Sequence, residues 1–142
     1  MTTYLGALGR PPVYISQSDR ERLFRLLDTV NTDSPIALAL GEEVERATVV
    51  PDRSARRFVK LGSQVEIENL PSRRIRTVRL SMPDETNADA GDLSVLSPAG
   101  AALIGLREGE TFGWSDAAGR RHTIRVLRIF DGYGGDDGPV AA

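Results

Sequence analysis

Apolar positions follow two different periods along this chain of 142 residues. Between residues 16 and 50 they recur at every third or fourth position, which is typical of amphipathic helices. Between residues 58 and 130 they alternate with polar positions in short runs separated by Gly, Pro, Asn and Asp, which is typical of strands and turns. The pattern predicts an α+β protein whose helices precede its sheet.

Two short helices are predicted in the first region. Ser16 or Ser18 can begin the first helix, since Ser18 and Glu21 have the spacing of a capping box. Ser34 caps the second helix and Pro35 takes its first position. The apolar face of the first helix comprises Leu23, Leu26, Leu27 and Val30, and that of the second comprises Ala37, Leu40, Val44 and Ala47.

These helices have about 13 residues each, or ~20 Å, which is marginal for a helix alone in water. We therefore expect their apolar faces to pair as a short antiparallel hairpin. Gly41 lies inside the second helix, where it costs up to ~1 kcal/mol relative to Ala.

The second region predicts a single antiparallel sheet. Alternating runs occur in "SQVEIENL", "RTVRLSM", "DLSVL" and "HTIRVLRIF". The apolar phase slips at Leu127 in the last run, which predicts a β-bulge there. The chain then divides into an extended segment at 1–15, a helical hairpin at 16–50, a sheet domain with one short helix at 51–131 and a Gly- and Asp-rich tail at 132–142 that we expect to be disordered.

A compact unit, "LSVLSPAGAALIGLREGETFGW", interrupts the alternation. Ser97 can cap a helix of one to two turns that begins at Pro98 and stops at Gly105. Small residues follow Pro98, so this helix can lie close to the sheet or to a partner. Gly109 then turns the chain into the run "ETFGW".

Composition limits the chemistry of the protein. The net charge is −2, and Cys is absent, so nonspecific duplex binding, direct sequence-specific DNA binding, disulfides and thiolate zinc sites are not expected. No apolar run approaches the ~20 residues of a membrane span, and no signal peptide is recognised, which predicts a cytoplasmic protein. We expect no catalytic residue, no metal site and no cofactor.

Three weaker features have ordinary structural explanations. His122 lacks a second His or a Cys and is expected to be an exposed or hydrogen-bonded side chain. Phe112 and Trp114 share one face of a strand, which favours core packing over an exposed anchor. Two arginine sets can bind phosphate or an acidic surface, but are more often solvated: Arg53, Arg56 and Arg57, and Arg73, Arg74 and Arg76.

The pattern from "KLGSQVEIENL" through "LSVLSPAGAALIGLREGE" to "HTIRVLRIF" resembles the C-terminal domain of the Gre transcript-cleavage factors. The opening "RPPVYISQSDRERL" and the short hairpin resemble the Rnk branch of Gre-like proteins, the regulators of nucleoside diphosphate kinase. The resemblance covers about residues 10 to 130. It implies an FKBP-like sheet domain that docks near the secondary channel of RNA polymerase.

In that family the Ser-Pro turn belongs to the surface that grips the coiled-coil rim of the channel. The resemblance thus implies that the polymerase-docking residues are Leu96, Ser97, Pro98, Ala99, Gly100 and Leu103. Gre factors often carry an acidic residue where this chain has Leu96, which affects the polar part of the contact. The corresponding hairpin tip comprises Asp28, Asn31, Thr32 and Asp33, and it lacks the Gre pattern of an Asp followed three residues later by a Glu.

Three functions remain open on these grounds. The favoured one is a monomeric regulator that binds core RNA polymerase and competes with Gre factors without stimulating transcript cleavage. The second is a cleavage factor whose acidic tip, through Asp28 or Asp33, helps to hold the catalytic metal. The third is a prolyl isomerase, which needs an aromatic pocket; the aromatic residues available are Phe112, Trp114, Phe130 and Tyr133.

Overall fold

The computed structural model describes residues 13–30 and 33–130. Its α-helices are α1 (Gln17–Thr29), α2 (Pro35–Arg46) and α3 (Pro98–Leu103). Its strands are β1 (Tyr14–Ser16), β2 (Thr48–Val50), β3 (Gln64–Leu70), β4 (Arg74–Ser81), β5 (Asp92–Ser94), β6 (Thr111–Ser115) and β7 (Arg121–Phe130). Two short 3₁₀ turns, η1 (Pro83–Glu85) and η2 (Ala88–Ala90), join β4 to β5. The mixed α+β class predicted from the sequence is confirmed.

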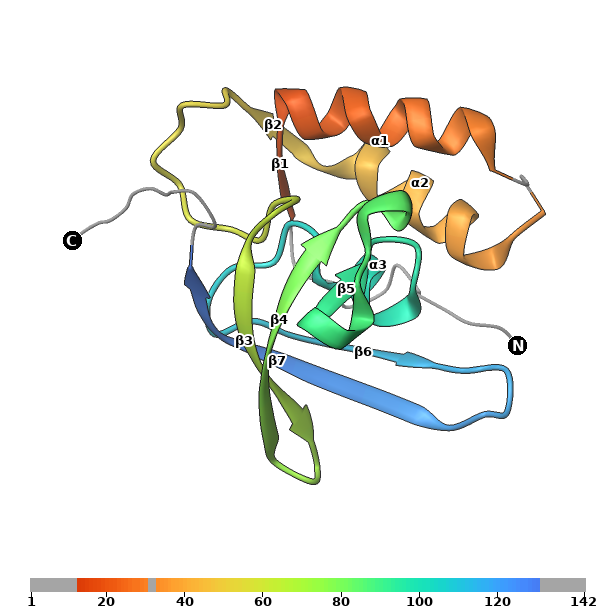
Figure 1. Ribbon diagram of the computed structural model, residues 1–142, viewed down its shortest axis with the longest axis vertical. Helices are drawn as coiled ribbons and strands as arrows, with labels where there is room; N and C mark the ends of the chain where they lie inside the picture. The colour runs from red at the N-terminus through yellow and green to blue at the C-terminus, as the bar shows by residue number, and fades with distance from the viewer. Residues whose placement is uncertain (1–12, 31–32, 131–142) are drawn as a thin grey trace.

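Both long helices begin at the residues that local sequence chemistry favours. Ser16, rather than Ser18, caps α1: its hydroxyl accepts a hydrogen bond from the backbone N–H of Asp19 at 3.3 Å. Ser34 caps α2 in the same way, and Pro35 takes the first helical position as predicted. The two helices contact each other and lie together on one side of the curled sheet (Figure 1).

The five-stranded sheet has the order β5-β4-β3-β7-β6. The four longest strands pair antiparallel, as the alternation predicts. The expectation of a wholly antiparallel sheet is wrong at one edge, because β5 pairs parallel to β4. The physical reason is the connection: the chain crosses back through η1 and η2 before β5 begins, so β5 runs in the same direction as β4.

A bulge in β7 confirms the predicted slip of the apolar phase. Glu66 pairs with Arg128 and Ile67 pairs with Val126, so Leu127 is the extra residue. The bulge lets Val126 and Ile129 both face the core, where their exposed fractions are 0% and 1%.

A second, two-stranded pairing was not predicted. β1 runs parallel to β2, with Ile15 opposite Val49. The backbone N–H of Tyr14 also bonds to the carbonyl oxygen of Gly105 at 3.3 Å, next to α3. Val13 and Ile15 are buried in the same core as the sheet. Residues 13–15, the described part of the segment predicted as extended, therefore belong to the folded core structure.

One continuous hydrophobic core joins the helices to the inner face of the sheet. Leu23 of α1, Leu40 of α2 and Leu103 of α3 are fully buried in it, together with Val65 and Ile67 of β3. Phe112 and Trp114 are also buried, which confirms their expected role in packing. Within the described residues, no helix is both long and apolar enough to span a bilayer.

Candidate functional site: a cleft beside the Ser-Pro turn

The Ser-Pro turn is held in place by a dense set of short hydrogen bonds. The hydroxyl of Ser97 accepts the backbone N–H of Gly100 at 3.0 Å and donates to the carbonyl oxygen of Ser94 at 2.7 Å. Pro98 occupies the first position of α3, where its missing N–H leaves no helical bond unmade. The strand end, cap and short helix predicted from the sequence are confirmed.

Two glycines allow α3 to sit close to its neighbours. A Cβ on Gly100 would lie 1.9 Å from the carbonyl oxygen of Ser94, and one on Gly105 would lie 2.7 Å from that of Tyr14. Gly105 also has φ +83°, a conformation that L side chains rarely adopt. No larger residue fits at Gly100 without moving the backbone, so the position of the turn over the sheet is fixed.

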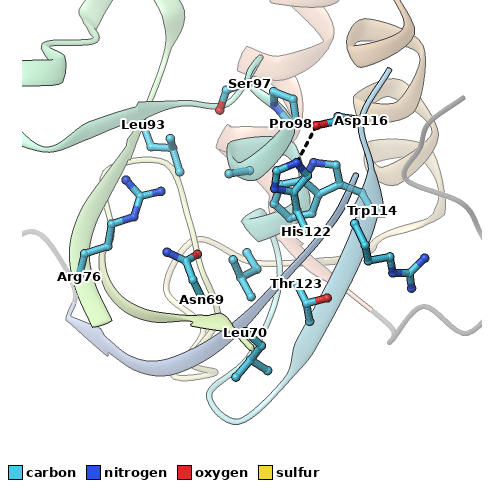
Figure 2. Close-up of a pocket in the computed structure, with 13 residues that line it drawn as sticks. Asn69, Leu70, Arg76, Leu93, Ser97, Pro98, Trp114, Asp116, His122 and Thr123 are labelled. Carbon is cyan, nitrogen blue, oxygen red and sulfur yellow. Dashed lines mark hydrogen bonds and ion pairs between the residues drawn. The ribbon is translucent and has the colours of Figure 1, made fainter. Parts of the chain in front are cut away.

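A cleft of about 520 Å³ opens between this turn and the inner face of the sheet. Figure 2 shows Asn69 and Arg76 on one side and Pro98 and His122 on the other. The same face of the sheet continues into the core, where Ile67 pairs with Arg76 and Phe112 pairs with Ile124. The cleft is thus the place where the inner face of the sheet emerges at the surface.

The β6–β7 side of the cleft carries an ordered polar pair on an aromatic base. His122 stacks on Trp114 with ring centroids 5.3 Å apart, and its Nε2 lies 2.9 Å from a carboxylate oxygen of Asp116. This hydrogen bond, with the backbone N–H groups of Arg120 and Ala118, holds the pKa of the Asp116 carboxyl below its usual range. His122 is 44% exposed at its side chain and hydrogen-bonded, as the sequence analysis expected.

The six docking residues implied by the resemblance lie at different depths. Pro98 is exposed, and Leu96, Ser97 and Ala99 are half-buried. Gly100 and Leu103 are buried, so they support the turn from beneath. Ser97, Pro98 and Ala99 line the cleft.

The structure brings further residues to the cleft that the sequence analysis did not connect with the turn. They are Asn69, Leu70, Arg76, Leu93, Trp114, Asp116, Arg121, His122, Thr123 and Ile124. The period-two alternation assigned the faces of these strands correctly. It carried no signal of which strands are neighbours, and that information was needed to place them around Ser97 and Pro98.

The predicted hairpin tip lies apart from the cleft, at the facing ends of α1 and α2. Asp28 and Asp33 are both exposed there, and Asn31 and Thr32 fall outside the described residues. In residues 13–30 and 33–130, no three His, Cys, Asp or Glu side chains are grouped so that they could hold a metal ion.

The two arginine sets take different roles. Arg57 bonds to the carboxylate of Glu108 at 3.4 Å and to the carbonyl oxygen of Ile129, and Arg56 lies over the ring of Tyr14 at 5.0 Å. Arg73 pairs with Glu68 at 3.9 Å. These arginines serve local structure, whereas Arg76 lines the cleft.

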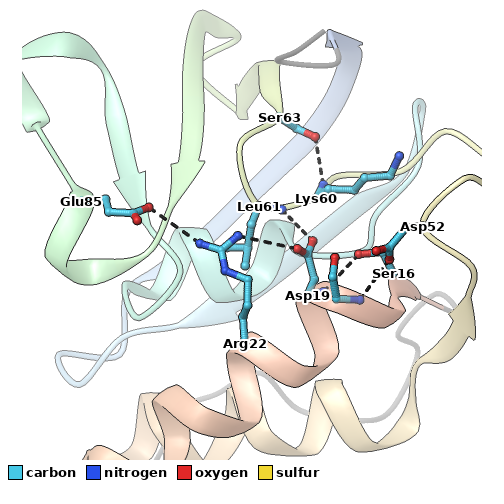
Figure 3. Close-up of polar contacts among 9 residues, drawn as sticks. Ser16, Asp19, Arg22, Asp52, Lys60, Leu61, Ser63 and Glu85 are labelled. Atoms are coloured by element: carbon cyan, nitrogen blue, oxygen red, sulfur yellow. Dashed lines mark hydrogen bonds and ion pairs between the residues drawn. The ribbon is translucent and has the colours of Figure 1, made fainter. Parts of the chain in front are cut away.

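A buried carboxylate joins the helices to the sheet and was missed by the sequence analysis. Asp19 is 6% exposed, and its carboxylate accepts the backbone N–H of Leu61 at 3.0 Å (Figure 3). Nearby, Asp52 accepts the N–H of Ser18 at 3.0 Å. Burial raises the pKa of the Asp19 carboxyl, against the lowering effects of the Leu61 N–H and of Arg22. We call Ser16, Asp19, Asp52 and Leu61 the joint.

Comparison with known proteins finds a matching family model for each half of the chain. Residues 54–131, more than half of it, match the family model of the GreA/GreB transcription elongation factor C-terminal domain, and residues 11–50 match that of the Rnk N-terminus. The regulator of nucleoside diphosphate kinase of Escherichia coli K12 is 33% identical over 124 residues, which cover 86% of this chain and 91% of that protein.

Similarity to elongation factors extends to a solved structure. Transcription elongation factor GreA of Syntrophobacter fumaroxidans is 40% identical over 68 residues, covering 48% of this chain and 43% of that protein. The structure of a GreA/GreB elongation factor from Nitrosomonas europaea superposes with a TM-score of 0.69 at 29% identity, covering 84% of this chain and 98% of that one. The chain is a member of the Rnk branch of the GreA/GreB family of transcription factors.

Proposed function

We propose that this protein is a regulator that binds core RNA polymerase near its secondary channel and competes there with Gre factors without stimulating transcript cleavage. The observation that carries the proposal is the cleft of about 520 Å³ beside Ser97 and Pro98, which lies within the residues that match the GreA/GreB C-terminal model. The docked element is a helix of the channel rim, and the protein acts as a cytoplasmic monomer.

The sheet domain acts in this proposal as an FKBP-like docking scaffold and not as an isomerase. Trp114 is the one predicted aromatic residue that lines the cleft, since Phe112 is buried in the core and Phe130 is 38% exposed elsewhere. Tyr133 falls outside the described residues. A single aromatic side chain supports a docking surface better than an aromatic-lined catalytic pocket.

The length of the helices supports binding without cleavage. At 13 residues, α1 reaches about 20 Å, and its tip offers Asp28 and Asp33 on separate helix ends. A hard cation such as Mg²⁺ needs oxygen ligands that converge at a fixed reach. Backtracked transcription complexes should therefore keep full-length transcripts when the protein is added, and the protein should reduce the cleavage stimulated by an added Gre factor. Shortened transcripts with this protein alone would show a cleavage factor instead.

Co-purification with core RNA polymerase tests the docking site. Pro98→Asp places a charge on the exposed turn and should abolish retention while the variant stays folded. Pro35→Asp is the matched control, because Pro35 is also an exposed first residue of a helix behind a Ser cap, but at the tip. The control should be retained with polymerase. Full retention of folded Pro98→Asp would place the docking site elsewhere.

A further inference from the structure

Arg76 has no ion-pair or hydrogen-bond partner for its guanidinium among the described residues, although it lines the cleft. It lies on β4 at the same face as Val78 and Leu80, which are 4% and 0% exposed. Alternation along the strand thus directs Arg76 to the side of the sheet that forms the core and the cleft. Figure 2 shows it across the cleft from Pro98 and Trp114.

The carboxylates of the neighbouring strand cannot neutralise Arg76. Glu66 and Glu68 alternate with the buried Val65 and Ile67 on β3, so they face the opposite side of the sheet. Glu68 is already shared by Arg125 at 3.5 Å and Arg73 at 3.9 Å.

The acidic group across the cleft is satisfied by its own surroundings. Asp116 accepts the backbone N–H groups of Ala118 and Arg120, each at 2.9 Å, as well as the bond from His122. The cleft therefore presents an engaged anion, Asp116, and two arginines that have no ion pair among the described residues, Arg76 on its β4 side and Arg121 on its β7 side. A partner therefore gains an ion pair in the cleft by bringing a negative charge, and Arg76 is the arginine that lies across the cleft from the turn.

Apolar side chains also line the cleft beside the turn. Leu93 is half-buried, Pro98 is exposed, and Trp114 forms the base. Leu96, in front of the turn, offers no charge. An arginine fork beside an apolar floor suits a carboxylate side chain that is followed by an apolar one.

We propose that the cleft recognises an acidic segment of its protein partner, whose carboxylate pairs with Arg76 while an adjacent apolar side chain packs against Pro98 and Trp114. This inference rests on the proposed function and names the chemistry of the polymerase helix that docks there. Arg76 is then the residue that fixes the register of docking, because its guanidinium pairs with one carboxylate of the partner, a contact that the uncharged Leu96 cannot make.

The test compares two charge reversals on the same strand. Arg76→Glu should weaken binding to core RNA polymerase by on the order of tenfold to a hundredfold, as expected when one partner of a desolvated charge pair is reversed. Arg79→Glu is the matched control, because Arg79 is exposed on the opposite face of β4. This substitution changes the net charge by the same amount as Arg76→Glu. Its affinity should stay within about threefold of wild type. Arg76→Gln should also make the affinity less dependent on salt than it is in wild type.

The outcomes separate this inference from the proposed function. If Pro98→Asp abolishes binding and folded Arg76→Glu binds as wild type does, the acidic-partner inference is overturned and the docking site stands. Equal weakening by Arg79→Glu would also overturn it, because a general charge effect would then explain both variants. If the wild-type protein does not bind polymerase at all, the proposed function itself fails.

Discussion

The helical pair and the cleft use polar side chains in opposite ways. At the joint, polar groups around the start of α1 bond within the protein: Ser16 caps the helix, and Asp19 and Asp52 accept backbone N–H groups 42 and 34 residues away. At the cleft, Asp116 and His122 are hydrogen-bonded to each other, but Arg76 has no ion-pair partner among the described residues. The polar groups of the joint hold the fold together, whereas the cleft is the surface that we propose recognises a partner.

This difference predicts that variants at the joint and variants at the cleft affect stability and polymerase binding in opposite ways. Changes at the joint should lower the free energy of unfolding and leave polymerase binding of the folded protein unchanged. Changes on the open surface of the cleft, such as Pro98→Asp and Arg76→Glu, should do the reverse. Gly100 is the exception that links the two, because it lies under the turn and shapes the cleft from within.

Gly100→Val should therefore have the largest effect and should impair both properties. The added side chain meets the Ser94 carbonyl, which is backbone and cannot swing away, so the free energy of unfolding should fall by about 3 kcal/mol. Chemical denaturation measures the loss, and polymerase retention measures the distortion of the cleft.

Gly41→Ala, a glycine substitution in α2 of the helical pair, is the control for Gly100→Val. The nearest atom to a Cβ there is the flexible end of Leu27 at 3.7 Å, an ordinary contact. Removing a glycine from the interior of α2 should stabilise the protein by up to about 1 kcal/mol. A destabilised Gly41→Ala, or a neutral Gly100→Val, would contradict the assigned packing.

Asp19→Ala should cost about 1 to 3 kcal/mol of unfolding free energy, because the N–H of Leu61 loses its acceptor in a partly buried place. Asp19→Asn keeps an acceptor oxygen and should cost less. Both variants should bind polymerase normally once folded, measured under conditions where denaturation curves show the native state to be dominant. Loss of binding by folded Asp19→Ala would show that the joint also shapes the docking surface.

The contributions of Asp19 and Asp116 to the free energy of unfolding should depend on pH with opposite signs. Because the folded pKa of Asp19 is raised, its folded form binds a proton more tightly than the unfolded chain. Relative to Asp19→Asn, wild type should gain stability as the pH falls through that raised pKa and lose it as the pH rises again. Denaturation curves of both proteins across the acidic range measure the difference.

Asp116 provides the comparison for that measurement. Its folded pKa is lowered, so wild type relative to Asp116→Asn should lose stability as the pH falls through the lowered value. The effect should be smaller than at Asp19, because Asp116 lies at the surface. If the stability difference between wild type and variant changed with pH in the same direction at both sites, the contrast between the joint and the cleft would be wrong.

Sequence reasoning reached the local features of both regions and missed those that depend on distant contacts. The caps at Ser34 and Ser97 and the bulge at Leu127 were predicted, because each depends on residues within a few positions. The parallel pairing of β5 was not, since strand neighbours are chosen by the path of the chain.

The same limit applies to the functional residues. Asp19 has the position of an ordinary first-turn acid, and only the fold brings Leu61 to it. Arg76 belonged to an arginine set that is normally solvated, and its proposed role depends on its position across the cleft from Pro98. The Ser-Pro turn was identified in advance because its residues are contiguous, while the opposite wall comes from another part of the chain.

Asp28→Ala should have the smallest effect. Its side chain is exposed near the end of α1, so the free energy of unfolding should change by less than about 0.5 kcal/mol. Polymerase retention should also be unchanged, since the recognising surface lies at the cleft and α1 serves as a fixed attachment. A marked loss of binding by Asp28→Ala, with Pro98→Asp unaffected, would move recognition from the cleft to the helix tip and reverse the roles assigned to the two regions.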